Sequence, residues 1–258
     1  MQTVIYPSPV FGPVRSRRLG VSLGINLMPA DGKICTFDCL YCECGLNNER
    51  KPLSGRPTRQ QVRECLEEKL QCMSNEGPAP DVLTFAGNGE PTAHPEFPEI
   101  VNDVISLRNR YFPGARVSVL SNATRIGIPA VRSALLKVDD NIQKLDAADI
   151  GYIQKLDRPV GSYDLQTTIG HLKSFNGHVI IQTMFLSGTV GGSDMDNTSD
   201  TYVLPWLDAL RTICPEKVMI YTIARNTPVD GLVKASPSVL DSIAERVRQS
   251  GLMVSVSY

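Results

Sequence analysis

Strand-like and helix-like segments alternate along almost all of this 258-residue chain. Segments such as 82–86 and 116–121 are short apolar runs of strand type, and 96–110, between them, repeats apolar residues at helical spacing. Such alternation implies a parallel sheet with right-handed helical crossovers. Six repeats and a terminal strand are too few for an eight-fold barrel. We therefore predict an α/β fold, a partial (β/α)6 TIM-like barrel in a single domain.

The individual elements follow from the same patterns. Thr58 to Gln61 has the sequence of a capping box and predicts the start of a helix, on whose apolar face Cys65 is predicted to be a core residue. Residues 187–193 are predicted to be a flexible loop. The other predicted helices are 96–110, 129–136, 164–175, 201–213 and 236–250. The predicted strands are 21–27, 82–86, 116–121, 141–145, 178–186, 217–223 and 253–257.

Length and composition restrict the organisation further. A chain of this length fits one domain, which we assign to residues 1–258, with a short N-terminal extension at 1–20 and a cysteine loop at 28–46. No apolar run reaches membrane-spanning length, so we expect no membrane association. The net charge of −1 gives no overall basic field for nucleic acid.

Cys35, Cys39 and Cys42 lie in the run Cys-Thr-Phe-Asp-Cys-Leu-Tyr-Cys. Three thiolates from one loop can hold three corners of an iron–sulfur cube, leaving the fourth iron open to a small molecule. Zinc is the alternative, with Cys44 as the fourth ligand of a non-catalytic zinc-binding module. Disulfides are disfavoured because the cysteine count of seven is odd and no signal-peptide pattern is present.

Two further polar segments follow predicted strands. The turn Gly87-Asn88-Gly89-Glu90-Pro91-Thr92 comes directly after strand 82–86, and Ser121-Asn122 ends strand 116–121. Sites in parallel barrels gather at the carboxyl ends of the strands. We therefore expect both segments and the cysteine loop to converge on one rim.

Several runs resemble one branch of the radical S-adenosylmethionine (radical SAM) superfamily, the Fe–S oxidoreductases related to wyosine synthesis. The runs are Ser16-Arg17-Arg18-Leu19-Gly20, Leu23-Gly24-Ile25-Asn26, Phe37-Asp38-Cys39-Leu40-Tyr41-Cys42, Gly87-Asn88-Gly89-Glu90-Pro91-Thr92, Lys144-Leu145-Asp146-Ala147, Leu156-Asp157-Arg158-Pro159 and Met219-Ile220-Tyr221-Thr222. The resemblance implies a partial barrel with one [4Fe-4S] cluster on Cys35, Cys39 and Cys42, and S-adenosylmethionine as the second cofactor. It further implies an enzyme that cleaves S-adenosylmethionine reductively to a 5′-deoxyadenosyl radical, which abstracts hydrogen from an unidentified substrate.

The resemblance also suggests which side chains bind S-adenosylmethionine. Tyr41 matches the aromatic residue that packs on adenine, and the turn at 87–90 matches the glycine-glycine-glutamate motif. Its glycines would let the backbone approach the methionine end, and Glu90 would accept a hydrogen bond from the amino group. Asn88 departs from the family pattern, in which glycine is common. The further candidates at strand ends and in the barrel lumen are Ser121, Asn122, Lys144, Asp146, Gln182 and Met184.

The substrate stays open at this stage, and we assign no catalytic residue. Arg17 and Arg18 suit recognition of a phosphate or carboxylate on the substrate. The alternatives within the class are a tRNA-modifying enzyme, an enzyme that modifies a peptide or small metabolite, and an activase of a glycyl-radical enzyme. The resemblance favours RNA as substrate, whereas the near-neutral charge argues against it. We expect a reducing partner such as flavodoxin or ferredoxin, and a cytoplasmic location, where thiolates and an oxygen-sensitive cluster persist.

Overall fold

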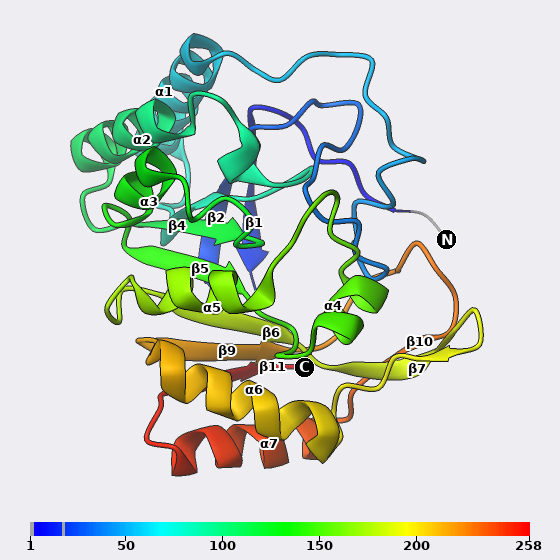
Figure 1. The fold of residues 1–258 in the computed structure, drawn as a ribbon. Coiled ribbons are helices and arrows are strands. Elements are labelled where there is room, and N and C mark those ends of the chain that lie inside the picture. Colours follow the sequence, from blue (N-terminus) through cyan, green and yellow to red (C-terminus); the bar gives the residue numbers. More distant parts are fainter. Residues whose placement is uncertain (1–2, 17–18) are drawn as a thin grey trace.

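In the computed structural model, which describes residues 3–16 and 19–258, one eight-stranded sheet organises the chain. Its order is β1-β2-β3-β4-β5-β6-β9-β11, and every neighbouring pair is parallel except β1 with β2. The sheet curls into a partial barrel with helices on its outer side (Figure 1). The predicted fold class is confirmed. The strands are β1 (Val10–Ser16), β2 (Gly20–Ile25), β3 (Val82–Phe85), β4 (Arg116–Ser121), β5 (Asp140–Lys144), β6 (Ile180–Met184), β9 (Lys217–Tyr221) and β11 (Val254–Ser257).

The helices of the crossovers begin largely where the sequence predicts. Thr58 caps the first of them by a capping box: its hydroxyl accepts from the Gln61 amide at 3.2 Å, and the Gln61 side chain accepts from the Thr58 amide at 2.8 Å. The helices are α1 (Arg59–Glu76), α2 (Phe97–Tyr111), α3 (Pro129–Leu135), α4 (Ile150–Leu156), α5 (Leu165–Lys173), α6 (Asp200–Ile213) and α7 (Pro237–Gln249), with a 3-10 turn, η1 (Pro91–Ala93). None of the helices within the described ranges is long and apolar enough to cross a membrane.

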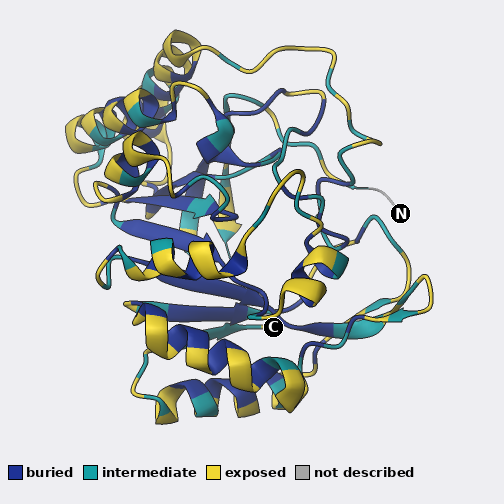
Figure 2. Cartoon of the chain, viewed as in Figure 1, coloured by how far each residue is buried: buried dark blue, intermediate teal, exposed yellow. Residues whose placement is uncertain are grey.

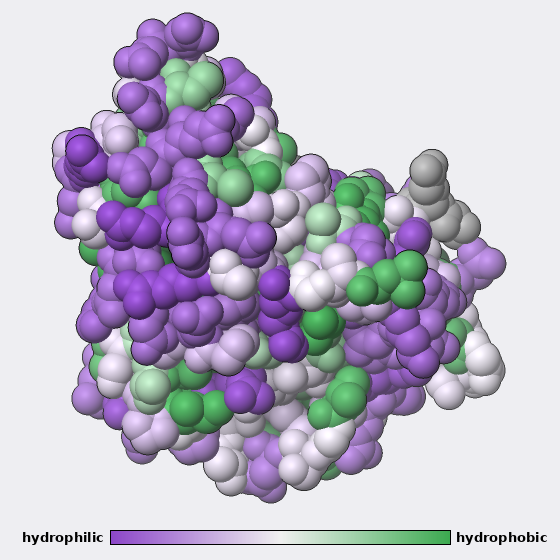
Figure 3. Space-filling model, turned by 90° about the horizontal axis from the view of Figure 1, so that it is seen from above, coloured by the Kyte–Doolittle hydropathy of each residue, from purple (hydrophilic) through white to green (hydrophobic). Residues whose placement is uncertain are grey.

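Apolar side chains pack on both sides of the sheet. The main core lies between the strands and the helices, where Figure 2 shows buried strands and helices with exposed outer faces. A second, small cluster of Ile142, Ile180 and Met219 lies on β5, β6 and β9, with Leu120 packed against it. The strand period of two puts Ile180, Gln182 and Met184 on one side of β6. Hydrophilic residues dominate the face seen from above, with hydrophobic ones in small groups (Figure 3).

The structure differs from the predicted elements in three places. The segment before residue 17, predicted as an extension, forms the antiparallel edge strand β1. Helix α4 is too short to show a clear helical period in the sequence. The predicted flexible loop at 187–193 contributes to a small three-stranded sheet of β7 (Leu186–Val190), β8 (Ser193–Asp194) and β10 (Leu232–Lys234). Cys65, predicted as core, is exposed, whereas its neighbours Val62 and Leu66 are buried. Its position lies at the edge of the apolar stripe.

Candidate functional site

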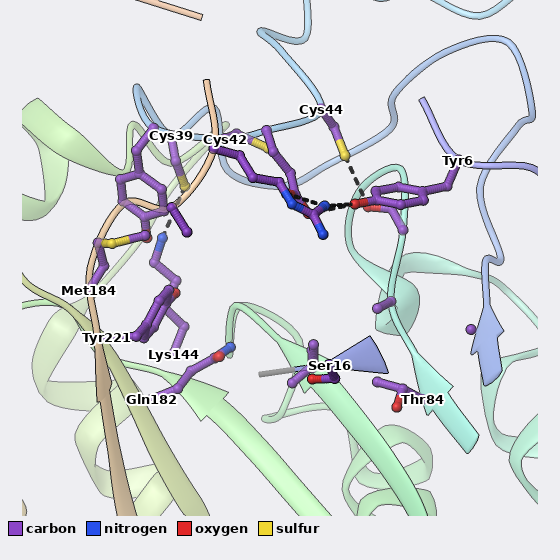
Figure 4. Close-up of a pocket in the computed structure, with 18 of the residues that line it drawn as sticks. Tyr6, Ser16, Cys39, Cys42, Cys44, Thr84, Lys144, Gln182, Met184 and Tyr221 are labelled. Carbon is purple, nitrogen blue, oxygen red and sulfur yellow. Dashed lines mark hydrogen bonds and ion pairs between the residues drawn. The ribbon is translucent and has the colours of Figure 1, made fainter. Parts of the chain in front are cut away.

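One cavity, of about 410 Å³, opens at the carboxyl ends of the parallel strands. Its wall comes from the cysteine loop, the turn after β3, the ends of β4, β5, β6 and β9, and the N-terminal segment. Figure 4 shows the labelled side chains pointing toward this space from elements far apart in the sequence. The segments expected to converge on one rim therefore lie together. The predicted residues that line the cavity are Cys35, Cys39, Tyr41, Cys42, Gly87, Gly89, Glu90, Ser121, Asn122, Lys144, Gln182 and Met184.

The cysteine loop is held by backbone hydrogen bonds on two sides. On one side, the amide of Ile34 donates to Asn88 at 3.0 Å and its carbonyl accepts from Glu90 at 3.1 Å. On the other, the amides of Asp38 and Leu40 donate to the carbonyls of residues 156–158 after α4, at 2.9–3.0 Å. The loop lacks regular structure of its own. Its shape therefore depends on tertiary contacts with segments that lie roughly 50 to 120 residues further along the sequence.

The two glycines of the turn after β3 are required by packing against protein. Gly87 and Gly89 have φ of +130° and +138°, a region that favours glycine. A Cβ on Gly89 would lie 1.8 Å from the carbonyl oxygen of Ile34, and one on Gly87 2.7 Å from Cγ of Asn26. The sequence interpretation gave these glycines the role of admitting a cofactor. That role stays a prediction, and the structure adds a second one: Gly89 lets the turn approach the cysteine loop at Ile34, and Gly87 lets it approach Asn26.

Glu90 joins this turn to the end of β4. Its carboxylate accepts from the amide and hydroxyl of Thr92, at 3.0 and 2.5 Å, and from the amide of Asn122 at 2.7 Å. Burial raises the pKa of Glu90, while these hydrogen bonds oppose the rise. The Asn122 side chain then donates to the Thr36 hydroxyl at 2.8 Å and reaches the Cys35 sulfur at 3.6 Å. Glu90 thus positions Asn122 against the cysteine loop and lines the cavity at the same time.

Asn88, predicted to bind the cofactor, does not line the cavity. Its side chain is fully buried and pairs with the N-terminal segment as a strand would: it accepts from the Tyr6 amide and donates to the Tyr6 carbonyl, both at 2.8 Å. A third bond, also 2.8 Å, goes to the carbonyl of Pro29. A glycine here would lack all three bonds. The departure from the family pattern therefore has a local structural reason.

Lys144 is the centre of a buried charge network at the end of β5. Its ammonium lies 2.6 Å from Asp157, 3.2 Å from Asp146 and 3.0 Å from the Cys39 sulfur, and 4.5 Å from the centre of the Tyr41 ring. The Tyr41 hydroxyl donates to Asp146. Asp146, predicted as a cofactor ligand, does not line the cavity; it lies behind Tyr41 and Lys144 and orients both. Figure 4 shows the contact between Lys144 and Cys39.

The thiols differ in how readily they ionise. Burial raises the pKa of Cys35 to about 12 and that of Cys39 well above its usual value. Cys42 behaves in the opposite way: a hydrogen bond from Cys44 lowers its pKa to about 6, against the effect of burial. Cys44 also contacts the Gly87 carbonyl at 3.4 Å. Cys44, whose role the sequence left open, therefore lies beside the candidate ligand Cys42 and contacts the turn after β3.

The three thiols of the cysteine loop suit three corners of an iron–sulfur cube. Within the described ranges, no group of three or more His, Cys, Asp or Glu side chains is placed to hold one metal ion. A cube does not need such convergence, because each cysteine binds a different iron at a separate corner. Cys35, Cys39 and Cys42 are free thiols that line the same cavity. Zinc on Cys35, Cys39, Cys42 and Cys44 stays the alternative, and anaerobic reconstitution with iron and sulfide distinguishes the two.

Three residues that sequence reasoning missed cover the cavity next to the cysteine loop. Arg225, after β9, forms an ion pair with Glu43 at 2.7 Å and donates to the Tyr6 hydroxyl, which also bonds to Glu43 at 3.0 Å. Figure 4 shows a dashed line that ends on the hydroxyl of Tyr6. The only signal in the sequence was the position of Glu43 between Cys42 and Cys44. Arg17 and Arg18, predicted for substrate recognition, lie outside the described residues.

Comparison with known sequences places the chain in a family. No family model matches it. A UPF0026 protein of Synechocystis sp. is 31% identical over 225 residues, which is 85% of this chain and 77% of the relative. The chain belongs to the UPF0026 family. A UPF0026 protein of Helicobacter pylori J99 is 30% identical over 84% of the chain, and this chain spans 66% of that relative's length.

Solved structures agree on the fold of this UPF0026 protein. A radical SAM methyltransferase from Sphaerobacter thermophilus superposes with a TM-score of 0.69 at 14% identity, over 92% of this chain and 66% of its own. Archaeal TYW1 gives 0.52 at 12% identity, over 88% and 71%. At these identities the comparison establishes a shared partial-barrel fold. Activity and substrate need separate argument.

Proposed function

We propose that this protein is a radical SAM enzyme. A [4Fe-4S] cluster on Cys35, Cys39 and Cys42 would supply one electron that cleaves S-adenosylmethionine, and the resulting 5′-deoxyadenosyl radical would abstract hydrogen from a substrate. The observation that carries the proposal is that three free thiols of one loop line one cavity at the carboxyl ends of parallel strands. The radical SAM partial-barrel fold of the solved structures supports it.

The residues around the cavity have distinct roles in this proposal. Gln182 and Met184 form the wall contributed by β6, and Tyr41 offers an aromatic surface beside the thiols. Ser121 and Asn122 present polar groups from the end of β4. Glu90 has a carboxylate within the wall, and it keeps Asn122 in place. Together they would bind and orient S-adenosylmethionine and limit the access of water.

The substrate and the electron donor belong to the proposal as classes. We propose a flavodoxin or ferredoxin as donor, and the reducing cytoplasm as the location, in keeping with seven free cysteines. The specific branch related to wyosine synthesis rests on the sequence runs that resemble it. Salt-dependent binding of tRNA would favour RNA as substrate over a peptide or small metabolite.

The test is anaerobic reconstitution with iron and sulfide, followed by reduction in the presence of S-adenosylmethionine. We expect a brown protein that releases 5′-deoxyadenosine, and Cys39→Ala and Cys42→Ala variants that lose both iron and release. Cys214→Ala is the matched control, because Cys214 is exposed after α6 and should leave both intact. A Cys39→Ala protein that cleaves S-adenosylmethionine at the parent rate would refute the proposal.

A further inference from the structure

Three nitrogen donors lie around the cysteines of the cavity, one from the end of β4, one from β5 and one from the cysteine loop itself. Asn122, after β4, reaches the Cys35 sulfur at 3.6 Å, and Lys144, on β5, reaches the Cys39 sulfur at 3.0 Å. Lys33, within the cysteine loop itself, is held beside Cys42 through the backbone of Gly45. Hydrogen bonds and charge around thiolate ligands set the reduction potential of an iron–sulfur cluster. Two of these three donors carry a positive charge.

The two lysines differ in how far their charge is neutralised. Lys144 lies between the carboxylates of Asp157 and Asp146, at 2.6 and 3.2 Å. The nearest carboxylate to Lys33 is Asp38, at 3.9 Å, and Asp38 is shared with Arg158 at 3.3 Å. Lys33 instead donates to the neutral carbonyl of Gly45 at 2.7 Å. It is therefore the less compensated of the two cations.

Lys33 is also deeply buried, with 1% of its side chain exposed. A charge in such a place is screened little by solvent or salt. Its anchor is part of the cysteine loop, because the Gly45 amide donates to the Cys42 carbonyl at 2.9 Å. The ammonium thus keeps a fixed position relative to Cys42. Lys33 is also only two residues before Cys35 in the sequence, so its charge lies close to the thiols of the loop.

We propose that Lys33 is a positioning residue that raises the reduction potential of the cluster held by Cys35, Cys39 and Cys42. The inference rests on the function proposed above. Reduction adds one electron, from a flavin or iron–sulfur protein, to a site that three thiolates already make negative. A fixed cation lowers the free energy of the reduced, more negative state relative to the oxidised state. Lys33 thereby brings the potential within reach of a cellular reductant.

The experiment compares midpoint potentials in the reconstituted full-length chain, followed through the electron paramagnetic resonance signal of the reduced cluster. The variants are Lys33→Gln and Lys33→Met, which remove the charge, and Lys33→Arg, which keeps it. Lys137→Gln is the matched control, since Lys137 is an exposed lysine whose ammonium bonds to Asn102 at 2.9 Å. The control variant loses the same unit of charge, but at a position exposed to solvent.

We expect both neutral variants to shift the midpoint to more negative values, and the Arg variant and the control to match the parent. If only the Arg variant takes up iron, a positive charge is needed at this place, which also supports the proposal. An unchanged midpoint in an iron-replete Lys33→Gln protein overturns it, as does failure of all three Lys33 variants to take up iron. A parent chain without a cluster overturns the proposed function as well, whereas a parent that cleaves S-adenosylmethionine isolates the failure to Lys33.

Discussion

Single polar side chains hold irregular backbone around the cavity through specific hydrogen bonds. Asn88 replaces a strand partner for Tyr6, and Asn26 holds the Met28 and Asn88 amides at 3.0 and 3.2 Å. His94 works in the same way: one ring nitrogen bonds to the Pro57 carbonyl at 2.8 Å, and the other accepts from the Glu96 amide at 3.1 Å. Such hydrogen bonds give irregular segments a defined conformation, as backbone hydrogen bonds do in helices.

His94 gives a prediction about pH. Burial lowers its pKa, so the unfolded chain takes up a proton at a higher pH than the folded chain. The contribution of neutral His94 is therefore complete above the unfolded pKa near 6.5 and is lost as the pH falls below it. Between roughly pH 7 and pH 5, where histidine side chains titrate, we expect the free energy of unfolding to fall more in the parent than in His94→Gln. Urea unfolding of both proteins at each pH measures this difference, and the same pH dependence of stability in both would contradict it. His171 and His178 are present in both proteins, so their contributions cancel.

At the level of elements, the loops after the strands make the site and hold one another. The cysteine loop pairs with the turn after β3 through Ile34 and Gly89, and with the segment after α4 through Phe37 and Pro159. These are isolated bridges, so neither segment extends a regular strand. The turn and the loop are therefore expected to lose their shape together when either is disturbed.

Gly89→Ala tests this dependence. The new Cβ would overlap the Ile34 carbonyl, and alanine disfavours a φ of +138°. We expect the free energy of unfolding to drop by about 3 kcal/mol, the upper size of a backbone strain, together with weaker iron uptake. Gly170→Ala is the matched control: it lies within α5 with open space around the added Cβ, and should gain about 0.5–1 kcal/mol. Equal stability of the two variants in urea would count against the packing role.

Across the whole molecule, the contacts of Arg225 join three distant segments over the open side of the barrel. The N-terminal segment brings Tyr6, the cysteine loop brings Glu43, and the connection after β9 brings Arg225. The pair is largely exposed, with 58% and 39% of the two charged side chains accessible. Such a pair contributes little to global stability, but its position controls how the N-terminal segment lies over the cavity.

Arg225→Ala should separate local from global effects. We expect the free energy of unfolding to change by less than about 1 kcal/mol, while amide hydrogen exchange rises in residues 3–9 and in the connection after β9. Arg211→Ala, which removes an exposed pair with Asp208 on α6, is the matched control and should leave exchange in these segments unchanged. Unaltered exchange in the Arg225 variant would mean that the other bonds of the N-terminal segment, such as those from Asn88 and Asn26 to Tyr6, hold it without Arg225.

Local sequence signals were sufficient for most of the architecture. Strand and helix periodicity predicted the partial barrel, and the capping box placed the start of α1, because both depend on neighbours within a few residues. Helix α4 and strands β1, β7, β8 and β10 were not predicted because short or edge elements have weak local patterns and form through tertiary pairing. The spacing of the cysteines likewise indicated a shared site, because thiols on one short loop cannot lie far apart.

The direction of each side chain was decided by tertiary structure alone. The sequence put Asn88 and Asp146 among the cavity residues, yet both face protein groups, because their hydrogen-bond partners come from Tyr6 and Tyr41. No local pattern in the sequence distinguishes Lys33, and only folding buries its side chain within the cysteine loop. The sequence alone determined the fold and the three candidate ligands. Which charges and hydrogen bonds surround those ligands depends on contacts between distant segments, and local sequence patterns do not contain them.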